Sequence, residues 1–307
     1  MITSTKNPRI VEARKLMQRK HRLEQNRFLV EGLQLLSLAV QAAAQPQARV
    51  KPVEVFYSEA LFTGETAPRL LAQLTQAGAE AIPVAPYVLD TLSERDVSQG
   101  LAATFSLSDL EWSLDELELT LSPNQSIPDS ENKRSQASLD AAAPPFASED
   151  AHSTSALLLV LDKLQDPGNL GTLIRTADAV GVRAIILLEP CVDPFDPKTV
   201  RGTMGSLFTV PFARTKNVED LLPRLTQSGY RLVGANGQRG EPPWQSEVLA
   251  GSVALVLGNE ARGLSPELRP HLQDYVRLPL RGQAESLNVS VAGGALMYEW
   301  LRVNEQG

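Results

Sequence analysis

Cysteine is almost missing from this sequence, because Cys191 is the only one among 307 residues. A single thiol excludes an internal disulfide and a multi-cysteine metal site, and it suits a reducing compartment, for which the cytoplasm is the default. No stretch approaches the roughly 18 consecutive apolar residues that span a bilayer, and the first six residues lack the apolar core of a signal peptide. Membrane-spanning and secreted classes are therefore not expected.

Two phosphate-binding motifs are also missing. No Gly-x-Gly-x-x-Gly follows a predicted strand and no phosphate-loop lysine is present, which counts against dinucleotide dehydrogenases and nucleoside triphosphatases. The three histidines have no metal-ligand spacing, so we predict no metal site. Cys191 has no histidine nearby, and we expect a core or surface thiol rather than a nucleophile.

Length and composition indicate an ordinary globular protein with two domains. Hydrophobic residues make up 43% of the chain and charged residues 21%. Residues 118–155 are rich in serine, alanine, proline and acids, and they hold too few apolar side chains for a core. We therefore predict an N-terminal domain over residues 1–110, a linker or disordered insertion over 118–155, and a second domain over 156–307.

Charge is distributed unevenly along the chain. The formal net charge is -7, yet the first 27 residues hold eight lysines and arginines against only Glu12 and Glu24. These cations are Lys6, Arg9, Arg14, Lys15, Arg19, Lys20, Arg22 and Arg27. We call residues 1–27 the basic arm. A charge run of this kind is usually a solvated helix face, so on its own it does not establish a binding site.

Hydrophobic patterning predicts α/β structure in both domains. In the first, helical spacing covers residues 10–17 and 69–76, and strand-like runs cover 53–57 and 82–84. In the second, apolar runs at 157–161, 184–188, 232–235, 252–257 and 275–280 alternate with helix candidates at 169–180, 218–227 and 288–301. This alternation predicts a mostly parallel, buried sheet. The last helix is rich in alanine, glycine and serine, and we expect it to be buried.

Three polar, glycine-containing segments follow strands of that sheet, where ligands of such sheets bind. They run from Asp162 to Thr176, from Leu257 to Leu264 and from Leu278 to Ala295. A structural role is open for each. Asn169 suits the N-cap of a helix, Arg175 could form a surface ion pair, and the second segment could be a tight turn. Glu260 would need a partner, for example Arg175 or Arg262.

Taken together, DPGNLGTLIRTADAVG, LGNEARGLS and LPLRGQAESLNVSVAGGAL resemble the three ordered motifs of the SpoU (TrmH-type) RNA 2'-O-methyltransferases of the SPOUT class. The resemblance covers residues 156–305 and extends to NRFLVEG at residues 26–32, which is similar to a substrate-binding domain found in many members. It implies an α/β SPOUT domain with a deep trefoil knot, preceded by a small α/β substrate-binding domain. It also implies a homodimer whose interface completes the active site.

The resemblance implies S-adenosylmethionine as methyl donor and no metal. Carried over by motif, the catalytic positions are Arg175, Asn169, Glu260, Ser286 and Asn288, and the cofactor-binding positions are Leu257, Gly258, Asn259, Leu278, Leu280 and Leu287. Arginine is a poor base because its pKa exceeds about 12. We therefore expect Arg175 to stabilise the developing alkoxide and hold a phosphate, with a role as base left open.

The expected substrate is structured RNA, with large-subunit ribosomal RNA favoured over transfer RNA because of the N-terminal domain. A catalytically silent RNA-binding assembly factor on the same fold is the alternative of a different class. With the family in view, the basic arm becomes a candidate RNA contact. Residues 201–206, RGTMGS, resemble another family stretch near the substrate side, where packing or a dimer contact is also open.

Overall fold

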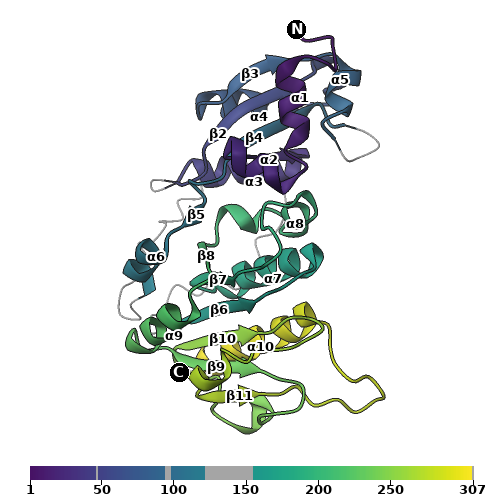
Figure 1. Ribbon diagram of the computed structural model, residues 1–307. Coiled ribbons are helices and arrows are strands. Elements are labelled where there is room, and N and C mark those ends of the chain that lie inside the picture. Colours follow the sequence, from purple (N-terminus) through teal and green to yellow (C-terminus); the bar gives the residue numbers. More distant parts are fainter. Residues whose placement is uncertain (46–47, 94–97, 122–154, 306–307) are drawn as a thin grey trace.

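The computed structural model describes residues 1–45, 48–93, 98–121 and 155–305. Two α/β units are stacked along the long axis of the molecule (Figure 1). Helix α6 (Leu114–Leu121) takes in the first four residues of the predicted linker. Residues 122–154 lie outside the described residues. Within the described part of the chain, no helix is both long and apolar enough to cross a membrane.

The N-terminal unit is a four-stranded sheet in the order β1-β4-β2-β3, mixed in direction. β4 pairs antiparallel with β1 and β2, and β2 pairs parallel with β3. Its strands are β1 (Arg27–Glu31), β2 (Pro52–Tyr57), β3 (Glu80–Pro83) and β4 (Leu101–Ser106), and its helices are α1 (Pro8–Lys15), α2 (Arg19–Gln25), α3 (Leu33–Ala43), α4 (Thr66–Gln76) and α5 (Pro86–Asp90). The small α/β domain predicted from the sequence is confirmed.

The C-terminal unit is a seven-stranded sheet in the order β11-β9-β10-β6-β7-β8-β5, and all its pairings are parallel. Its strands are β5 (Glu111–Trp112), β6 (Leu157–Asp162), β7 (Ala184–Leu188), β8 (Phe212–Thr215), β9 (Arg231–Ala235), β10 (Val253–Leu257) and β11 (Asp274–Val276). Its main helices are α7 (Pro167–Val180), α8 (Pro197–Gly202), α9 (Val218–Gln227) and α10 (Val289–Asn304). The parallel sheet was predicted, but β5 and β8 were not.

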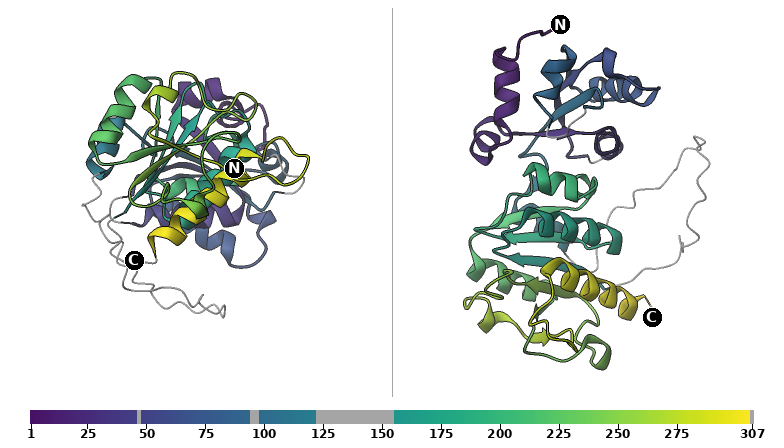
Figure 2. Two further views of the ribbon diagram at one scale, coloured as in Figure 1. Left: turned by 90° about the horizontal axis from the view of Figure 1, so that it is seen from below. Right: turned by 90° about the vertical axis from the view of Figure 1, so that its right-hand side faces the viewer.

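Alternate side chains of the central strands face two different helical layers. Leu157, Leu159 and Leu161 of β6 belong to the core that also holds buried side chains of α7 and α10. Leu158 and Val160 belong to a second core with α9. Figure 2 shows α7 and α10 side by side along one face of this sheet. The sheet is therefore buried on both faces, as parallel sheets usually are.

One hydrophobic core runs through both units, and each unit has a further core of its own. The ring of Phe28 in β1 lies 4.8 Å from the ring of Phe195, which precedes α8. Phe105 in β4 and Phe208, in the segment before β8, have ring centroids 5.5 Å apart. Because aromatic pairs at such distances bury large areas, they fix the two sheets against each other.

Arg22 is a polar anchor beside this aromatic contact. Its side chain is 2% exposed, and its Nε and Nη2 donate to Asp193 Oδ2 at 3.0 and 2.8 Å. Its Nη1 donates to the carbonyl oxygens of Leu16 and Met17. The candidate RNA contact predicted for the basic arm is therefore wrong for Arg22, because the side chain is buried between the domains.

Other cations of the basic arm are neutralised by acids that tertiary structure brings near them. Arg9 pairs with Glu80, Lys15 with Glu12, Arg19 with Glu189 and Arg27 with Glu54. Glu80, Glu189 and Glu54 are distant from the basic arm in the sequence. In the folded protein they reduce the net positive charge around the arm below the value counted along residues 1–27. Lys20 lies 3.8 Å from Glu24 in the next turn of α2. For Lys6, Arg14 and Lys20, which are all exposed, an RNA contact stays a prediction.

Cys191 is buried, at 6% exposure, next to the carboxyl end of β7. Burial raises the pKa of its thiol to about 12, so the reactive thiolate is scarce at neutral pH. Of the core and surface positions left open for this thiol, the core position is the one observed.

Candidate functional site

Three predicted catalytic side chains meet at the carboxyl ends of β6 and β10. Asn169 Nδ2 donates to Glu260 Oε1 at 3.1 Å, and Asn288 Nδ2 donates to Asn169 Oδ1 at 2.9 Å. Ser290 Oγ, which the motif analysis did not single out, donates to Asn288 Oδ1 at 2.6 Å. Four side chains from three segments therefore form one hydrogen-bonded chain, which we call the polar cluster.

Glu260 is held by amide N–H groups rather than by an arginine. Its carboxylate accepts the backbone N–H groups of Gln165 at 3.2 Å and Asp166 at 3.1 Å, in addition to Asn169. Desolvation raises the pKa of Glu260, but these hydrogen bonds outweigh it and leave the pKa below its ordinary value. The suggested partners Arg175 and Arg262 are therefore wrong, because the loop after β6 supplies the donors.

Asp166, not Asn169, caps helix α7. The carboxylate of Asp166 accepts the backbone N–H of Asn169 at 2.8 Å, and Pro167 occupies the first helical position. Proline suits that position because it has no N–H group to leave unpaired. Asn169 thus lies in the first turn with its side chain free to join the polar cluster. Asn288 does cap a helix, since its Oδ1 accepts the N–H groups of Ser290 and Val291 at the start of α10.

The segment after β10 closes as a tight turn. Asn259 and Gly263 exchange backbone hydrogen bonds of 3.0 and 2.9 Å, and Asn259 Nδ2 donates to the Lys163 carbonyl at 2.7 Å. A Cβ on Gly258 would overlap the backbone of Gly263 and Leu264. Only glycine fits there, so the tight turn considered for this segment exists and also forms the wall of a cavity.

That cavity, of about 510 Å³, lies between the turn and the segment that follows β11. All six predicted cofactor-binding residues line it: Leu257, Gly258, Asn259, Leu278, Leu280 and Leu287. The strand predicted over 275–280 ends at Val276, which releases residues 277–280 to form a wall. Pro279 fits this shortening because it cannot donate to a sheet ladder. Residues 277–288 form the loop that projects from the sheet beside α10 in Figure 1.

The remaining two catalytic candidates are placed differently. Ser286 is exposed and lines this cavity as well as a second one beside Asn169, Glu260 and Asn288. Arg175 lines neither of them. It is exposed on α7 and forms no hydrogen bond or ion pair with any residue that the structure describes. The single chain therefore brings Asn169, Glu260, Ser286 and Asn288 together, but not Arg175.

Helix α10 is only half-buried, which corrects the expectation of a buried helix. Gly293, Leu296, Met297 and Trp300 are its buried residues. Val291 and Tyr298 are 58% and 53% exposed. Small residues let α10 approach α7 closely on one side, while the opposite side presents apolar surface to solvent.

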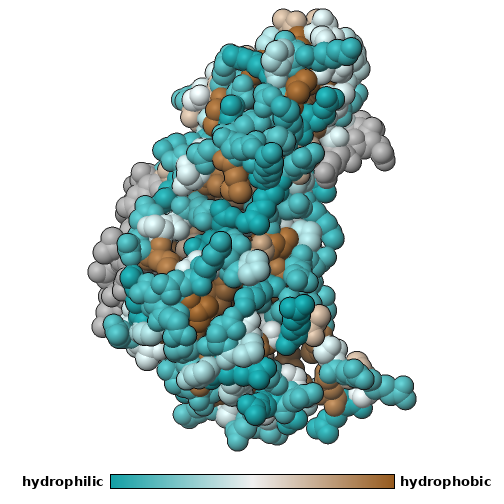
Figure 3. Space-filling model, in the orientation of Figure 1, coloured by the Kyte–Doolittle hydropathy of each residue, from teal (hydrophilic) through white to brown (hydrophobic). Residues whose placement is uncertain are grey.

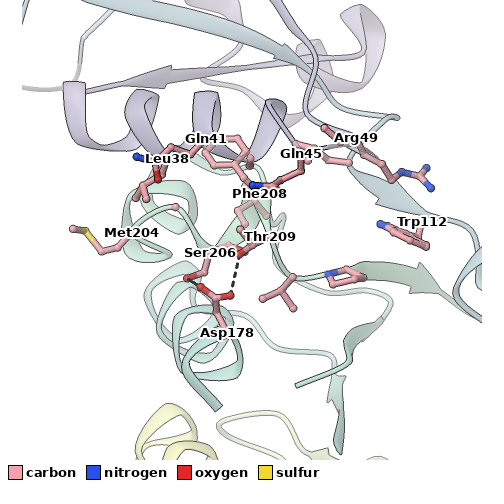
Figure 4. Close-up of a pocket in the computed structure, with 17 residues that line it drawn as sticks. Leu38, Gln41, Gln45, Arg49, Trp112, Asp178, Met204, Ser206, Phe208 and Thr209 are labelled. Atoms are coloured by element: carbon pink, nitrogen blue, oxygen red, sulfur yellow. Dashed lines mark hydrogen bonds between the residues drawn. The ribbon is translucent and has the colours of Figure 1, made fainter. Parts of the chain in front are cut away.

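The RGTMGS stretch at residues 201–206 packs against the N-terminal domain. Thr203 and Ser206 are buried, and a Cβ on Gly205 would overlap the side chain of Leu38 in α3. Figure 4 shows the cavity of about 480 Å³ next to it, where Asp178 accepts hydrogen bonds from Ser206 and Thr209. Of the roles left open for this stretch, packing between domains is the one observed.

Sequence reasoning missed the groups that support the site through their backbone. Gln165 and Asp166 donate N–H groups to Glu260, and Ala235 to Gln238 line the cavity of about 510 Å³ from the loop after β9. Every residue except proline has a backbone N–H group, so the residue type does not reveal which of these groups will act as donors. The loop after β9 could have been found from the sequence, because the turn residues Asn236 and Gly237 directly follow an apolar strand.

Comparison with known proteins agrees with this architecture. Residues 156–298 match the SpoU rRNA Methylase family, and residues 7–103 match an MRM3-like substrate binding domain. An uncharacterised tRNA/rRNA methyltransferase of Synechocystis is 31% identical over 97% of this chain and 92% of its own length. The 23S rRNA (guanosine(2553)-2'-O)-methyltransferase RlmP of Bacillus subtilis is 29% identical over 97% of both chains.

Solved structures show the same arrangement. The AdoMet-bound rRNA methyltransferase from Sinorhizobium meliloti superposes with a TM-score of 0.76 at 29% identity, covering 98% of this chain and 97% of that one. The SpoU methyltransferase AviRb from Streptomyces viridochromogenes, in complex with AdoMet, gives 0.75 at 26% identity, over 97% and 98% of the chains. Since the relatives match across both units, this chain belongs to the SpoU rRNA methylase family and carries an N-terminal substrate-binding domain.

Proposed function

We propose that the protein transfers a methyl group from S-adenosylmethionine to a ribose 2'-hydroxyl of large-subunit ribosomal RNA. The observation that carries this proposal is the polar cluster of Asn169, Glu260 and Asn288 beside a cavity lined by all six predicted cofactor-binding residues. Relatives named as 23S rRNA 2'-O-methyltransferases support the RNA class. The reaction takes place in the cytoplasm, where such RNA is assembled.

The residues around the cavity suit S-adenosylmethionine. Its volume of about 510 Å³ falls in the range of small-molecule sites, roughly 300 to 1,000 Å³. Leu257, Leu278 and Leu280 offer apolar surface to an adenine ring, while the turn at Gly258 lets backbone approach the ligand. When bound, this cofactor supplies an electrophilic methyl group. No metal is part of the proposal.

The polar cluster orients groups rather than moving protons. The Glu260 carboxylate already accepts hydrogen bonds from three N–H donors. It therefore holds Asn169 and the loop after β6 in position instead of acting as a free base. Asn169, Ser286 and Asn288 hold the ribose and position its 2'-hydroxyl. Such positioning removes much of the entropic barrier of a bimolecular step.

Arg175 acts on the site of a second copy of the chain in a homodimer. In its own chain this arginine is exposed and lines neither cavity of the site. Next to it, α10 presents Val291, Ala295 and Tyr298 on its exposed side, a stripe at helical spacing. A second copy packed on this stripe would bury it and bring a guanidinium to the developing alkoxide. The trefoil knot implied by the family resemblance stays a prediction.

The first test is transfer of a labelled methyl group from S-adenosylmethionine to unmodified 23S ribosomal RNA, followed by mapping of the labelled nucleotide. Wild-type protein should label one ribose 2'-oxygen, and Arg175→Ala should lose at least a hundredfold in rate while S-adenosylmethionine still binds. Binding of RNA and cofactor without transfer, also to assembly intermediates and transfer RNA, would favour the silent assembly factor.

A second test separates action within one chain from action across the dimer. Arg175→Ala and Asn169→Ala proteins should each be inactive, but mixed dimers formed after joint refolding should regain up to about half of the wild-type activity per mixed dimer. This occurs because one of their two sites combines an intact Arg175 with an intact Asn169. Mixtures that stay inactive, although sedimentation shows mixed dimers, would place Arg175 in its own site.

A further inference from the structure

A further pocket adjoins the cofactor cavity, and apart from Leu280 its residues take no part in the proposed methyl transfer. It has a volume of about 350 Å³ and lies between the short helical turn Pro243–Gln245 and the start of the projecting loop. Its wall includes Trp244, Gln245, Arg277, Pro279, Leu280 and Arg281. We call it the tryptophan pocket. Leu280 lines both this pocket and the cofactor cavity, so the two are neighbours.

Trp244 differs from the other two tryptophans because its ring has no partner in the part of the chain that the structure describes. The guanidinium of Arg49 lies 4.6 Å from the ring centroid of Trp112. Trp300 is buried, and its Nε1 donates to the Gly251 carbonyl at 2.9 Å. Trp244 is 55% exposed and makes no ring contact or hydrogen bond with the described residues. A large ring left open at a pocket wall is typical of a ligand-binding surface.

The guanidiniums of this pocket also have no acidic partner among the described residues. Neither Arg277 nor Arg281 forms an ion pair with a described residue, in contrast to most cations of the basic arm. The Nε atom of Arg277 is buried and has no hydrogen-bond partner in the described part of the chain. Such an atom is rare in folded proteins, and a water molecule or a ligand has to supply its acceptor. The two guanidiniums therefore point to an anionic ligand.

The surroundings of the pocket strengthen the positive charge. Arg239 lies in the loop after β9, with its guanidinium 6.0 Å from the Tyr275 ring centroid. Residues 236–245 and 277–281 together hold three arginines against the single acid Glu241. Figure 3 shows brown apolar surface near the base of the projecting loop, among polar side chains. An apolar ring face with cations around it suits a nucleotide better than an apolar peptide.

From these contacts we propose that the tryptophan pocket binds a nucleotide of the substrate RNA that flanks the methylated ribose. Its base stacks on Trp244, and its phosphate accepts hydrogen bonds from Arg277 and Arg281. Because Leu280 joins the pocket to the cofactor cavity, a nucleotide seated there places its neighbour next to the reacting methyl group. This proposal rests on the proposed function, since it takes RNA as the substrate.

The first experiment measures binding of in vitro transcribed 23S ribosomal RNA by filter retention. Trp244→Ala should weaken binding roughly 5- to 100-fold, as loss of one stacked base does, and Trp244→Phe should restore most of it. Arg277→Gln should lower the slope of log K against log salt by about 0.7 to 0.9, the value for one phosphate contact. Lys216→Gln is the matched control, because this exposed cation follows β8, near the other edge of the sheet.

A second experiment reports on Trp244 directly. Acrylamide should quench its fluorescence in the free protein, and 23S ribosomal RNA should protect it. The protein with Trp244→Phe should show no RNA-dependent protection, because Trp300 is buried and the half-buried Trp112 of β5 lies beneath Arg49, at the opposite edge of the sheet from β11. The affinity for S-adenosylmethionine, measured by calorimetry, should stay within about twofold of wild type in all these variants.

The outcomes separate this inference from the proposed function. If wild-type protein binds and methylates ribosomal RNA while Trp244→Ala binds it equally well, the tryptophan pocket is not an RNA site and the methyltransferase function stands. If Trp244→Ala changes only the sedimentation of the protein, the ring belongs to a protein contact and the inference is wrong. If wild-type protein binds no RNA at all, both proposals fail.

Discussion

Glu260 links the turn after β10 to the loop between β6 and α7, which is far away in the sequence, and its hydrogen bonds lower its pKa. In glutamine one of the two acceptor oxygens is replaced by an NH2 group, which would face the N–H donors of Gln165 and Asp166. The carboxylate therefore contributes stability that glutamine does not. Because Glu260 is partly exposed, we expect this contribution to be only about 1 kcal/mol at neutral pH.

The contribution of Glu260 should depend on pH with a definite sign. Its folded-state pKa lies below the ordinary value of 4.5, so the unfolded chain binds more protons in the window between the two values. Stabilisation is present above pH 4.5 and is lost as pH falls through the folded-state pKa. Urea unfolding of wild type and Glu260→Gln should show a difference that shrinks below pH 4.5. A difference independent of pH would contradict this assignment.

Helix α7 carries Asn169 and Arg175, and its position depends on glycine at its contact with α8. A Cβ on Gly171 would lie 2.9 Å from Gly202 Cα and 2.9 Å from the Thr199 carbonyl oxygen. Both obstacles are backbone atoms of α8, so they cannot rotate away. Gly294 of α10 is a useful contrast, because its added Cβ would meet only Thr176 Cγ2 at 3.7 Å, an ordinary contact.

Alanine should therefore have opposite effects at these two helical glycines. Gly171→Ala should lower the free energy of unfolding by about 1–3 kcal/mol, the usual result of overpacking. Gly294→Ala should raise it by up to about 1 kcal/mol, because alanine favours the helix more than glycine does. Urea unfolding of both variants checks the pair. Equal effects of both substitutions would show that the contact between α7 and α8 is not tight.

The bounds of the strands show where hydrophobic patterns in the sequence predict structure correctly and where they do not. The strands at 157–161 and 184–188 were predicted because buried parallel strands are continuous apolar runs. β5 was missed because two residues carry no periodic pattern, and its assignment depends on pairing with β8. Residues 277–280 are apolar enough to suggest a strand, yet they leave the sheet after Val276. Only the neighbouring strand β9 decides where that pairing stops.

The buried pair of Arg22 and Asp193 holds the two domains of the molecule in one orientation. Removing one partner leaves a buried charge, so Asp193→Ala should lower the free energy of unfolding by about 3–5 kcal/mol. The double variant Arg22→Met/Asp193→Leu should lose less than the single one, because no charge then remains uncompensated. Urea unfolding checks both. A single variant as stable as wild type would show that the pair contributes nothing.

Cleavage of the chain offers a test of how the domains are joined. The composition of residues 118–155 predicts rapid proteolysis into two folded fragments. The shared aromatic core, the Arg22 anchor and the pairing of β5 with β8 all connect the first fragment to the second. We therefore expect the two fragments to elute together in gel filtration without denaturant. Separate elution would contradict a common core.

The family motifs, the two domains and the parallel sheet follow from the order of residues, because they depend on local patterns and short-range chemistry. Tertiary structure decided which charges are neutralised. Eight cations of the basic arm look alike in sequence, yet Arg22 is buried against Asp193, and acids from distant strands pair with Arg9 and Arg27. It also decided that Trp244, Arg277 and Arg281 share a pocket, because folding places segments more than thirty residues apart side by side.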